Sequence, residues 1–485
     1  MNMYKIISLI ALILMVFCLN ASAGEQKVGL FINEKGAVQG YNLFPPKTTT
    51  TFLIDMEGRL VHTWESKYLA EQSVYLLENG LLLRPASLRG AVPNRKGGGK
   101  IELLDWDSNV VWSFDYYSEK YIPHHDVEPL PNGNVLVLAY EFKTKEEAIA
   151  AGRNPKQLDS SEEVWPEKVV EIQKTGKDSG KVVWEWRIWD HLIQDFDKTK
   201  PNYGVVNEHP DLIDVNMGRR KADWLHANSV AYNTERDEII ISVRGISEIY
   251  VIDHSTTAEE VVTHAGGKSG MGGDILFRWG NPASYKCGDA EDMMLDGQHD
   301  AHWVSPGLPG AGNIMLFSNG VKRGYASADE IIPPLDKNGR YIMPAKGKAF
   351  GPPKQAWTYT APEKKDFFST AVSGVQRLPN GNTLICSGSP GIFFEVTTKG
   401  RIVWKYISPV AKGGDIIAME TDPLETNTVF RCTRILPDYA GLKNRDLTPM
   451  GTFHEVYPDK IITKVVANKG GKKGGKKGRN KGGKK

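Results

Sequence analysis

Three histidines open similar segments of the sequence. Their residue type and their recurrence indicate a candidate catalytic or binding site. His125 begins HDVEPLPNGNVLVLAY, His226 begins HANSVAYNTERDEIIISVR and His299 begins HDAHWVSPGLPGAGNIMLFSNG. Each histidine precedes a turn and then an apolar strand pattern. If these segments are repeats of one radial fold, residues remote in the chain meet on a common axis. The three imidazoles would then surround one pocket.

An arginine adds a permanent positive charge to this group. Arg244 ends the strand pattern IIISVR that follows His226. Its guanidinium stays charged and can grip two oxygens of an anion at once. Three imidazoles and an arginine suit a tetrahedral anion. Two other interpretations stay open: the histidines cap blades by hydrogen bonding, or they hold zinc or copper. Because Arg244 would weaken a cation site, we predict neither a metal nor a cofactor.

The residues beside the histidines are expected to face elsewhere. Successive side chains of a strand point to opposite faces. Asp126 and Asp300 should therefore bond to backbone or to a neighbouring blade rather than to a ligand. His124 and His302 should likewise point away from the axis.

Two recurring elements identify the fold that would position these side chains. Asn-Gly turns stand between strand patterns at 76–83, 129–138 and 377–386, as in β-hairpins. A short strand with a Trp near its end recurs at 58–64, 108–114, 180–186, 273–279, 354–359 and 400–406. Six such closing strands indicate six antiparallel units.

The ends of this array complement each other. The first closing strand has no opening strand before it, and the last opening strand, at 427–439, has little strand pattern after it. Strands at 50–65 would complete the blade begun at 427–439, which hides the open edges. We predict an all-β fold, one six-bladed β-propeller whose last blade is closed by an N-terminal strand.

The start of the chain reads as an export signal. Lys5 precedes the apolar run 6–19, and Ala21-Ser22-Ala23 offers a cleavage site. We expect a signal peptide at 1–23, an N-terminal extension at 24–49 and the catalytic propeller at 50–462. The protein would be periplasmic or secreted. No later stretch is apolar enough for a membrane span.

The end of the chain is a basic Lys/Gly tail, 463–485, expected to be disordered. The full chain has a net charge of +2, and residues 464–485 carry ten basic and no acidic residues, which leaves −8 for the rest. The tail is either merely solvated or attaches to an anionic surface or polymer, with no specific nucleic acid as partner. Beyond Cys18, three cysteines remain, Cys287, Cys386 and Cys432, enough for one disulfide at most.

A set of motifs carries a resemblance to a known family. In order they are HHDVEPLPNGN, DWLHANSVAYN followed by IIISVRG, RWGNP, GQHDAHW and FSNG. Together, over roughly 50–440, they resemble the bacterial arylsulfate sulfotransferases, which move sulfuryl groups without a nucleotide donor. The resemblance implies a periplasmic six-bladed propeller with its site in the central channel.

The resemblance also implies roles for individual residues. His299 looks like the nucleophile that becomes sulfohistidine. His125, His226 and Arg244 look like the groups that bind the sulfuryl oxygens and manage the proton, and Asn228 of the DWLHANS motif is a further substrate-binding residue. The expected reaction moves a sulfuryl group from an aryl sulfate to a phenolic acceptor by ping-pong kinetics. Two alternatives remain: an aryl sulfate hydrolase, or a non-catalytic propeller that binds an anionic polymer or carbohydrate.

Overall fold

The computed structural model describes residues 25–160 and 162–466. The predicted signal peptide at 1–23 and nearly all of the predicted basic tail lie outside this range. Within it, no helix is long and apolar enough to cross a membrane.

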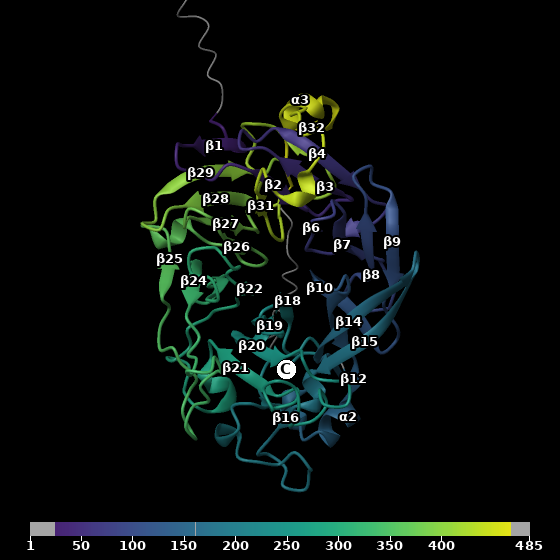
Figure 1. Ribbon diagram of the computed structural model, residues 1–485, viewed down its shortest axis with the longest axis vertical. Helices are drawn as coiled ribbons and strands as arrows, with labels where there is room; N and C mark the ends of the chain where they lie inside the picture. The colour runs from purple at the N-terminus through teal and green to yellow at the C-terminus, as the bar shows by residue number, and fades with distance from the viewer. Residues whose placement is uncertain (1–24, 161, 467–485) are drawn as a thin grey trace, which may run out of the picture.

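Six sheets of four or five strands stand around a common centre and form a β-propeller (Figure 1). The bounds of the strands in the first three blades are as follows. The first blade holds β5 (Leu69–Ala70), β6 (Tyr75–Leu76), β7 (Leu82–Ser87), β8 (Gly99–Leu104) and β9 (Val110–Asp115). The second holds β10 (Tyr121–Pro129), β11 (Val135–Glu141), β14 (Glu167–Gly176) and β15 (Ser179–Arg187). The third holds β18 (Ala227–Asn233), β19 (Glu238–Val243), β20 (Glu248–Asp253) and β21 (Ile275–Trp279).

The other three blades complete the ring. The fourth holds β22 (His299–Trp303), β23 (Ile314–Ser318), β24 (Ser327–Ile331) and β25 (Trp357–Tyr359). The fifth holds β26 (Gly374–Arg377), β27 (Thr383–Ser387), β28 (Ile392–Val396) and β29 (Ile402–Ile407), with β1 (Gly29–Asn33) along its outer edge. The sixth holds β31 (Thr433–Ile435), β2 (Tyr41–Phe44), β3 (Thr50–Ile54) and β4 (Leu60–Glu65). All the pairs within the blades are antiparallel, as the hairpin turns require.

The fourth strand from the centre of every blade coincides with one of the six Trp-bearing segments. These strands are β4, β9, β15, β21, β25 and β29. Three of their tryptophans, Trp64, Trp186 and Trp404, are fully buried. Each ring covers a large apolar area at the outer end of the interface between two blades. The prediction of six blades is therefore confirmed.

The sixth blade joins the two ends of the chain, as predicted. Its inner strand, β31, comes from the C-terminal side, and the other three come from the N-terminal side. The register pairs Tyr41 with Ile435 and Leu43 with Thr433. The buried Arg434 clamps this junction: its guanidinium contacts the Asn42 side chain, the Val38 carbonyl and Glu395 of the fifth blade. The closing contribution begins at β2, earlier in the chain than the predicted 50–65.

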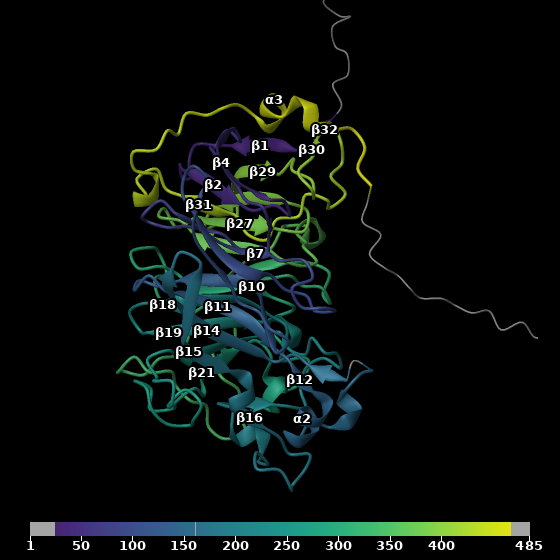
Figure 2. The ribbon, with the colours of Figure 1, turned by 90° about the vertical axis from the view of Figure 1, so that its right-hand side faces the viewer.

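The segment 24–49 contributes two strands to the blades, β1 and β2. The C-terminal segment returns beside it, where β32 (Ile461–Ile462) runs parallel to β30 (Ile416–Ile417). Val28, Ile417 and Ile462 pack together there. Both ends of the described chain therefore lie at the same end of the molecule (Figures 1 and 2).

Short elements lie in the loops that connect the blade strands and in the C-terminal segment. They are α2 (Lys145–Ala150), α3 (Phe453–Val456), the strand pairs β12 (Lys143–Thr144) with β13 (Glu163–Val164) and β16 (Leu192–Ile193) with β17 (Ile213–Asp214), and single-turn 3-10 helices. Both α-helices begin with a capping box, Thr144 with Glu147 and Thr452 with Glu455. The apolar core lies in layers between adjacent blades. Cys287, Cys386 and Cys432 are free thiols.

Candidate functional site

The inner strands are distorted where the histidines stand. Bulges interrupt the pairing of β10 between Pro123 and Val127, of β18 between Ala227 and Ser229, and of β22 between His299 and His302. The backbone is left-handed at His125, His226 and Asp300, with φ of 60°, 53° and 57°. Left-handed residues other than glycine are uncommon, and bulges re-aim side chains beside active sites. The same local device recurs in three blades at the positions the sequence repeats predict.

The structure brings His125, His226, His299 and Arg244 into one cluster at the inner ends of the second, third and fourth blades. The His125 and His226 ring centroids lie 4.9 Å apart at 82°. Burial, followed by the charges of His226, His124, His299 and Arg244, lowers the pKa of His125 well below its ordinary value. The amide N–H of Arg244 donates to the carbonyl of His226 (3.2 Å). The predicted residues thus share one site, and their chemical roles stay predictions.

His299 is the most enclosed member of the cluster, with 2% of its surface exposed. The Asn319 amide group donates to the carbonyls of Ser369 (2.9 Å) and Val372 (3.1 Å), so Oδ1 is the atom that faces His299. Oδ1 lies 2.6 Å from Nδ1 of His299, which must therefore carry a proton. The lone pair of the ring is then on Nε2. Burial, followed by the charge of Arg244, lowers the pKa of His299 well below its ordinary value, so the ring is neutral at pH 7.

The loop that covers His299 is held in a strained conformation. The N–H of Val372 donates to Nε2 of His299 (3.1 Å). Val372 has φ of 51° and Ser373 has φ of 98°. A left-handed β-branched residue costs about 1–3 kcal/mol and persists only where its surroundings hold it. Here the Val372 N–H and C=O are both bonded, to His299 and Asn319, so the strain coincides with the site.

His226 is oriented by a carboxylate three residues earlier. Its Nδ1 lies 3.0 and 2.8 Å from the two oxygens of Asp223, and the hydroxyl of Tyr140 donates to the same carboxylate (3.2 Å). Burial alone would raise the pKa of Asp223, but the hydrogen bond and charge of His226, together with Arg219, lower it to about 2. An ionised Asp223 fixes the proton of His226 on Nδ1 and leaves Nε2 for a ligand.

His125 is backed by a second histidine and a glutamate. Nδ1 of His125 lies 2.7 Å from Nδ1 of His124, and Nε2 of His124 lies 2.8 Å from Oε2 of Glu167. His124 and Glu167 are buried, whereas His125 is partly accessible. The Tyr140 ring stacks on His124 at 3.6 Å. His124 therefore points away from the axis, as predicted, but it contacts the site through His125.

The guanidinium of Arg244 has N–H donors that are not fully used in hydrogen bonds to the rest of the described chain. Its Nη2 makes a long hydrogen bond to the Thr370 carbonyl (3.4 Å), and its buried Nε has no hydrogen-bond partner among the described residues. Gly297 (φ 68°) stands next to it: a Cβ added there would lie 3.8 Å from Nε. Burial, followed by the charge of Arg219, lowers the Arg244 pKa from its usual value. An under-satisfied guanidinium beside two imidazoles is equipped to bind an anion.

Asn228, expected to bind substrate, is fully buried in the bulge of β18. Its Nδ2 donates to the carbonyl of Gln298 (2.8 Å), the residue before His299. Its Oδ1 has no hydrogen-bond partner in the described part of the chain. The amide therefore ties the third blade to the strand of His299.

A second arginine, Arg431, is partly exposed and contacts the aspartates that follow His125 and His299. Arg431 makes ion pairs with Asp126 (2.9 Å) and Asp300 (2.8 Å) and donates to the Tyr75 hydroxyl (2.7 Å). A cavity of about 270 Å³ is lined in part by Tyr75, Glu128 and Arg431. Arg431 therefore borders this cavity and also contacts the aspartates next to His125 and His299.

The predicted roles of the two aspartates are confirmed. Asp126 also accepts the backbone N–H of Val230 (3.3 Å), and Asp300 that of Val375 (2.8 Å), each on a neighbouring blade. His302, the fifth histidine near the axis, bonds the carbonyl of Asp300 (2.9 Å).

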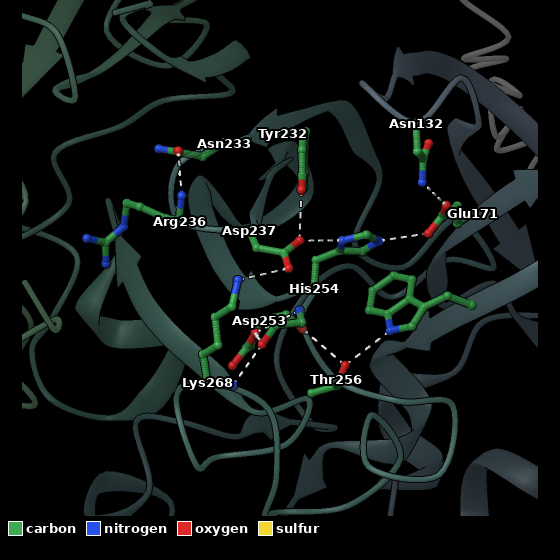
Figure 3. A network of polar contacts seen from close by, with 12 residues as sticks. Asn132, Glu171, Tyr232, Asn233, Arg236, Asp237, Asp253, His254, Thr256 and Lys268 are labelled. Atoms are coloured by element: carbon green, nitrogen blue, oxygen red, sulfur yellow. Dashed lines mark hydrogen bonds and ion pairs between the residues drawn. The ribbon is translucent and has the colours of Figure 1, made fainter.

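Two further histidine groups lie away from this cluster. His254 joins the second and third blades through Glu171 (3.0 Å) and Asp237 (2.8 Å), and Asp237 also accepts from Lys268 (3.2 Å) (Figure 3). In the described part of the chain, the side chains close enough to share a cation are His191, His264 and Asp274. Both imidazoles lie 2.8 Å from the same Asp274 oxygen, the separation of a hydrogen bond, so the carboxylate is already satisfied.

The residues that sequence analysis did not assign are those that hold the imidazoles: Glu167, Tyr140, Asp223 and Asn319. Two had a signal. Asp223 is part of DWLH, three residues before its histidine, and Asn319 is part of FSNG. Glu167 and Tyr140 carried none, because only the folded blades bring them to His124 and His226.

Comparison with known proteins identifies the class of protein that this fold and site define. The family model Arylsulfotransferase (ASST) matches residues 20–431. The chain belongs to the arylsulfotransferase family. A curated relative, arylsulfate sulfotransferase AssT of Escherichia coli, is 24% identical over 193 residues, which cover 38% of this chain and 30% of that protein. The matched part thus spans under a third of the relative's length.

Two solved structures of low sequence identity are also similar to this chain. A protein of unknown function from Bacteroides caccae has a TM-score of 0.43 and 10% identity, covering 81% of this chain and 98% of that one. A catalytically inactive virginiamycin B lyase from Staphylococcus aureus, solved with quinupristin, has a TM-score of 0.37 and 9% identity, covering 85% of this chain and 100% of that one.

Proposed function

We propose that this protein transfers a sulfuryl group from an aryl sulfate ester to a phenolic acceptor through a covalent adduct on His299. The observation that carries this proposal is the state of His299. Its Nδ1 proton is committed to Asn319, so Nε2 holds the lone pair beside Arg244. A neutral, oriented imidazole next to an under-satisfied guanidinium matches a nucleophile next to an anion-binding group.

In the first half-reaction Nε2 of His299 attacks sulfur and the phenolate leaves. The Val372 N–H, which now bonds Nε2, turns to a sulfuryl oxygen once sulfur occupies that position. Arg244 stabilises the charge on the other oxygens. The Nδ1 proton of His299 stays with Asn319, which stabilises the positive ring of the adduct.

In the second half-reaction a phenol takes the place of the departed product. Its hydroxyl must lose a proton as it attacks sulfur, because a neutral phenol has a pKa of about 10. A neutral imidazole among His125 and His226 serves as the base. The S–N bond breaks, the new sulfate ester leaves, and His299 returns to its neutral form.

The dependence of turnover on acceptor tests this proposal. The purified protein is mixed with 4-nitrophenyl sulfate, with and without added phenol, and both nitrophenolate and phenyl sulfate are measured. We expect phenol to raise the steady-state rate and parallel lines in double-reciprocal plots, as a ping-pong reaction gives. Equal turnover without phenol and no phenyl sulfate would identify a hydrolase instead. No turnover in either case would leave a binding propeller.

We also propose that the protein acts outside the cytoplasm, in the periplasm or after secretion. The support is the sequence of residues 1–23, a basic start, an apolar run and Ala21-Ser22-Ala23. The Lys/Gly run beyond residue 463 would attach the enzyme to an anionic surface or polymer, because its ten charges are all positive. Fractionation of cells, with and without the first 23 residues, tests export. Sedimentation with anionic vesicles at low and high salt tests attachment.

A further inference from the structure

Three side chains in line connect the interior of the second blade to the site. Oε2 of Glu167 lies 2.8 Å from Nε2 of His124, and Nδ1 of His124 lies 2.7 Å from Nδ1 of His125. Glu167 is fully buried and His124 is 3% exposed. Glu167 begins β14, and both histidines lie in the bulge of β10. Of the three residues, only His125, at the inner end of the line, is partly exposed.

The outer part of this line is held rigidly. The N–H of Ala227 donates to Oε1 of Glu167 (2.8 Å), which directs Oε2 to His124. The Tyr140 ring stacks on the His124 ring at 3.6 Å and 12°. Its hydroxyl is bonded to Asp223. The three groups therefore cannot turn away from one another without breaking contacts in two blades.

The close Nδ1–Nδ1 contact links the tautomers of the two histidines. Two ring nitrogens at 2.7 Å need one proton between them, since two lone pairs would repel and two protons would clash. If Glu167 holds a proton, it donates to Nε2 of His124, Nδ1 of His124 donates to His125, and His125 carries its other proton on Nε2. If Glu167 is ionised, both hydrogen bonds reverse their direction: Nε2 of His124 donates to Glu167, and Nδ1 of His125 donates to Nδ1 of His124. Nε2 of His125 then has the lone pair.

We propose that Glu167 and His124 form a proton relay that switches Nε2 of His125 between an acid and a base, one state for each half-reaction. The inference rests on the proposed sulfuryl transfer and gives positioning roles to two residues that do not touch substrate. His125 is the member that meets the phenolic oxygen.

The proton balance closes over one cycle. When the aryl S–O bond breaks and the S–N bond to His299 forms, Nε2–H of His125 passes its proton to the leaving phenolate. The Nδ1 proton of His124 moves to His125, and the proton of Glu167 moves to His124, so the carboxylate holds the negative charge. In the second half-reaction the acceptor phenol gives its proton to Nε2 of His125, and the same two transfers run backward.

The resting state agrees with this order of events. Burial raises the pKa of Glu167 well above its ordinary value, although the Ala227 N–H opposes this. Burial also lowers the pKa of His124 to about 3. The charged groups nearest Glu167 are Asp223, His226 and Arg219, whose effects have opposite signs. Both shifts favour the spare proton on the carboxyl of Glu167 rather than on the ring of His124. That arrangement leaves His125 in its acid form, ready for the donor ester.

Glu167→Gln tests the relay with little change of shape. The Ala227 N–H keeps the amide oxygen, so the amide nitrogen donates to His124 and locks His125 in one tautomer. The matched control is Glu171→Gln. Glu171 lies on the same strand and contacts His254 (3.0 Å), outside the catalytic cluster. His124→Phe, which keeps the stack on Tyr140, is the second test variant.

The readout is the dependence of adduct formation on the leaving group. Nitrophenolate is stable as an anion near neutral pH and needs no proton, whereas unsubstituted phenolate does. General acid catalysis contributes about 10²–10⁴-fold. We expect Glu167→Gln and His124→Phe to slow adduct formation from phenyl sulfate about 10²-fold or more and from 4-nitrophenyl sulfate about tenfold or less. Glu171→Gln should resemble the wild type with both donors.

A uniform loss would overturn the relay. If Glu167→Gln and His124→Phe slow both donors by the same factor, or leave both unchanged, neither residue moves a proton to the leaving group. A wild-type protein that forms no adduct with either donor would instead refute the proposed function. The two failures are therefore distinguished by the wild-type measurement alone.

Discussion

Removal of the Asn319 side chain should disturb the orientation of His299 strongly and lower the stability of the fold only moderately. Asn319 is fully buried and makes three hydrogen bonds, to His299 (2.6 Å), Ser369 (2.9 Å) and Val372 (3.1 Å). Each hydrogen bond contributes about 0.5–1.5 kcal/mol to stability. The loss of all three in Asn319→Ala should therefore lower the free energy of unfolding by about 3 kcal/mol. For a chain of this size that is a drop in Tm of about 3 °C.

The effect on chemistry should be larger. Without Oδ1 nothing holds the proton on Nδ1 of His299, and the Val372 loop loses its anchor. We expect the rate of adduct formation to fall about 10²–10⁴-fold. The lower figure is typical of losing one preorganised hydrogen bond, and the upper figure of losing control of a histidine tautomer.

Rapid mixing with 4-nitrophenyl sulfate measures this as the rate and amplitude of the first burst of nitrophenolate. The control is Asn382→Ala. Asn382 is a buried asparagine of the fifth blade that bonds the Gly36 carbonyl (3.0 Å) and Glu395 (2.7 Å). The Asn382→Ala variant should be less stable than the wild type but should keep the normal burst of nitrophenolate. A normal burst rate in Asn319→Ala would refute the reasoning that His299 needs this partner.

Three other changes test separate parts of the structure. Arg244→Gln should lower turnover about 10²–10³-fold, measured with the same substrate, because it removes a preorganised donor to the sulfuryl oxygens. His254→Gln should destabilise the protein most in mildly acidic buffer. Burial lowers the pKa of His254, but its hydrogen bonds to Glu171 and Asp237 outweigh burial and raise that pKa. The stability that His254 contributes is therefore present below pH 6.5 and is lost as the pH rises through the raised pKa. Thermal unfolding curves between pH 5 and 9 would show that difference shrink with rising pH, and a constant difference would contradict it. Arg434→Ala should cost about 3–5 kcal/mol in denaturant titrations because it leaves Glu395 buried and unpaired, whereas the exposed Arg401→Ala should be nearly neutral.

The architecture was predictable because its signals are local. An Asn-Gly turn and an alternating strand pattern need only neighbouring residues, and the Trp-bearing strands repeat once per blade. The closure of the ring followed from two incomplete units. The outer position of β1 did not, since nothing in GLFIN distinguishes an added edge strand from a loop.

The cluster of histidines was predictable, but its supports were not. Equivalent places in repeated blades must converge at the axis, so His125, His226 and His299 could be grouped from their spacing. The left-handed backbone of His125 depends on a bulge, and the register of β10 against β11 determines that bulge. Glu167 lies 43 residues beyond His124 in the chain. Its contact arises only when β14 pairs with β11.

The pH dependence of adduct formation separates His299 from an ordinary imidazole. Burial and the charge of Arg244 hold its pKa well below 6.5, so the ring keeps its lone pair in mild acid. We expect the rate of adduct formation from 4-nitrophenyl sulfate to stay level from pH 7.5 to 5.5. A tenfold fall across that range would show that His299 titrates like an exposed histidine.

The central claim is that His299 carries the sulfuryl group. The direct measurement is mass spectrometry of the protein mixed with 4-nitrophenyl sulfate in the absence of acceptor, followed by peptide mapping under mild alkaline conditions. We predict a gain of one sulfuryl group, located on His299, absent in His299→Asn and discharged when phenol is added. An adduct of the same yield in His299→Asn, or one located on another residue, would contradict the account.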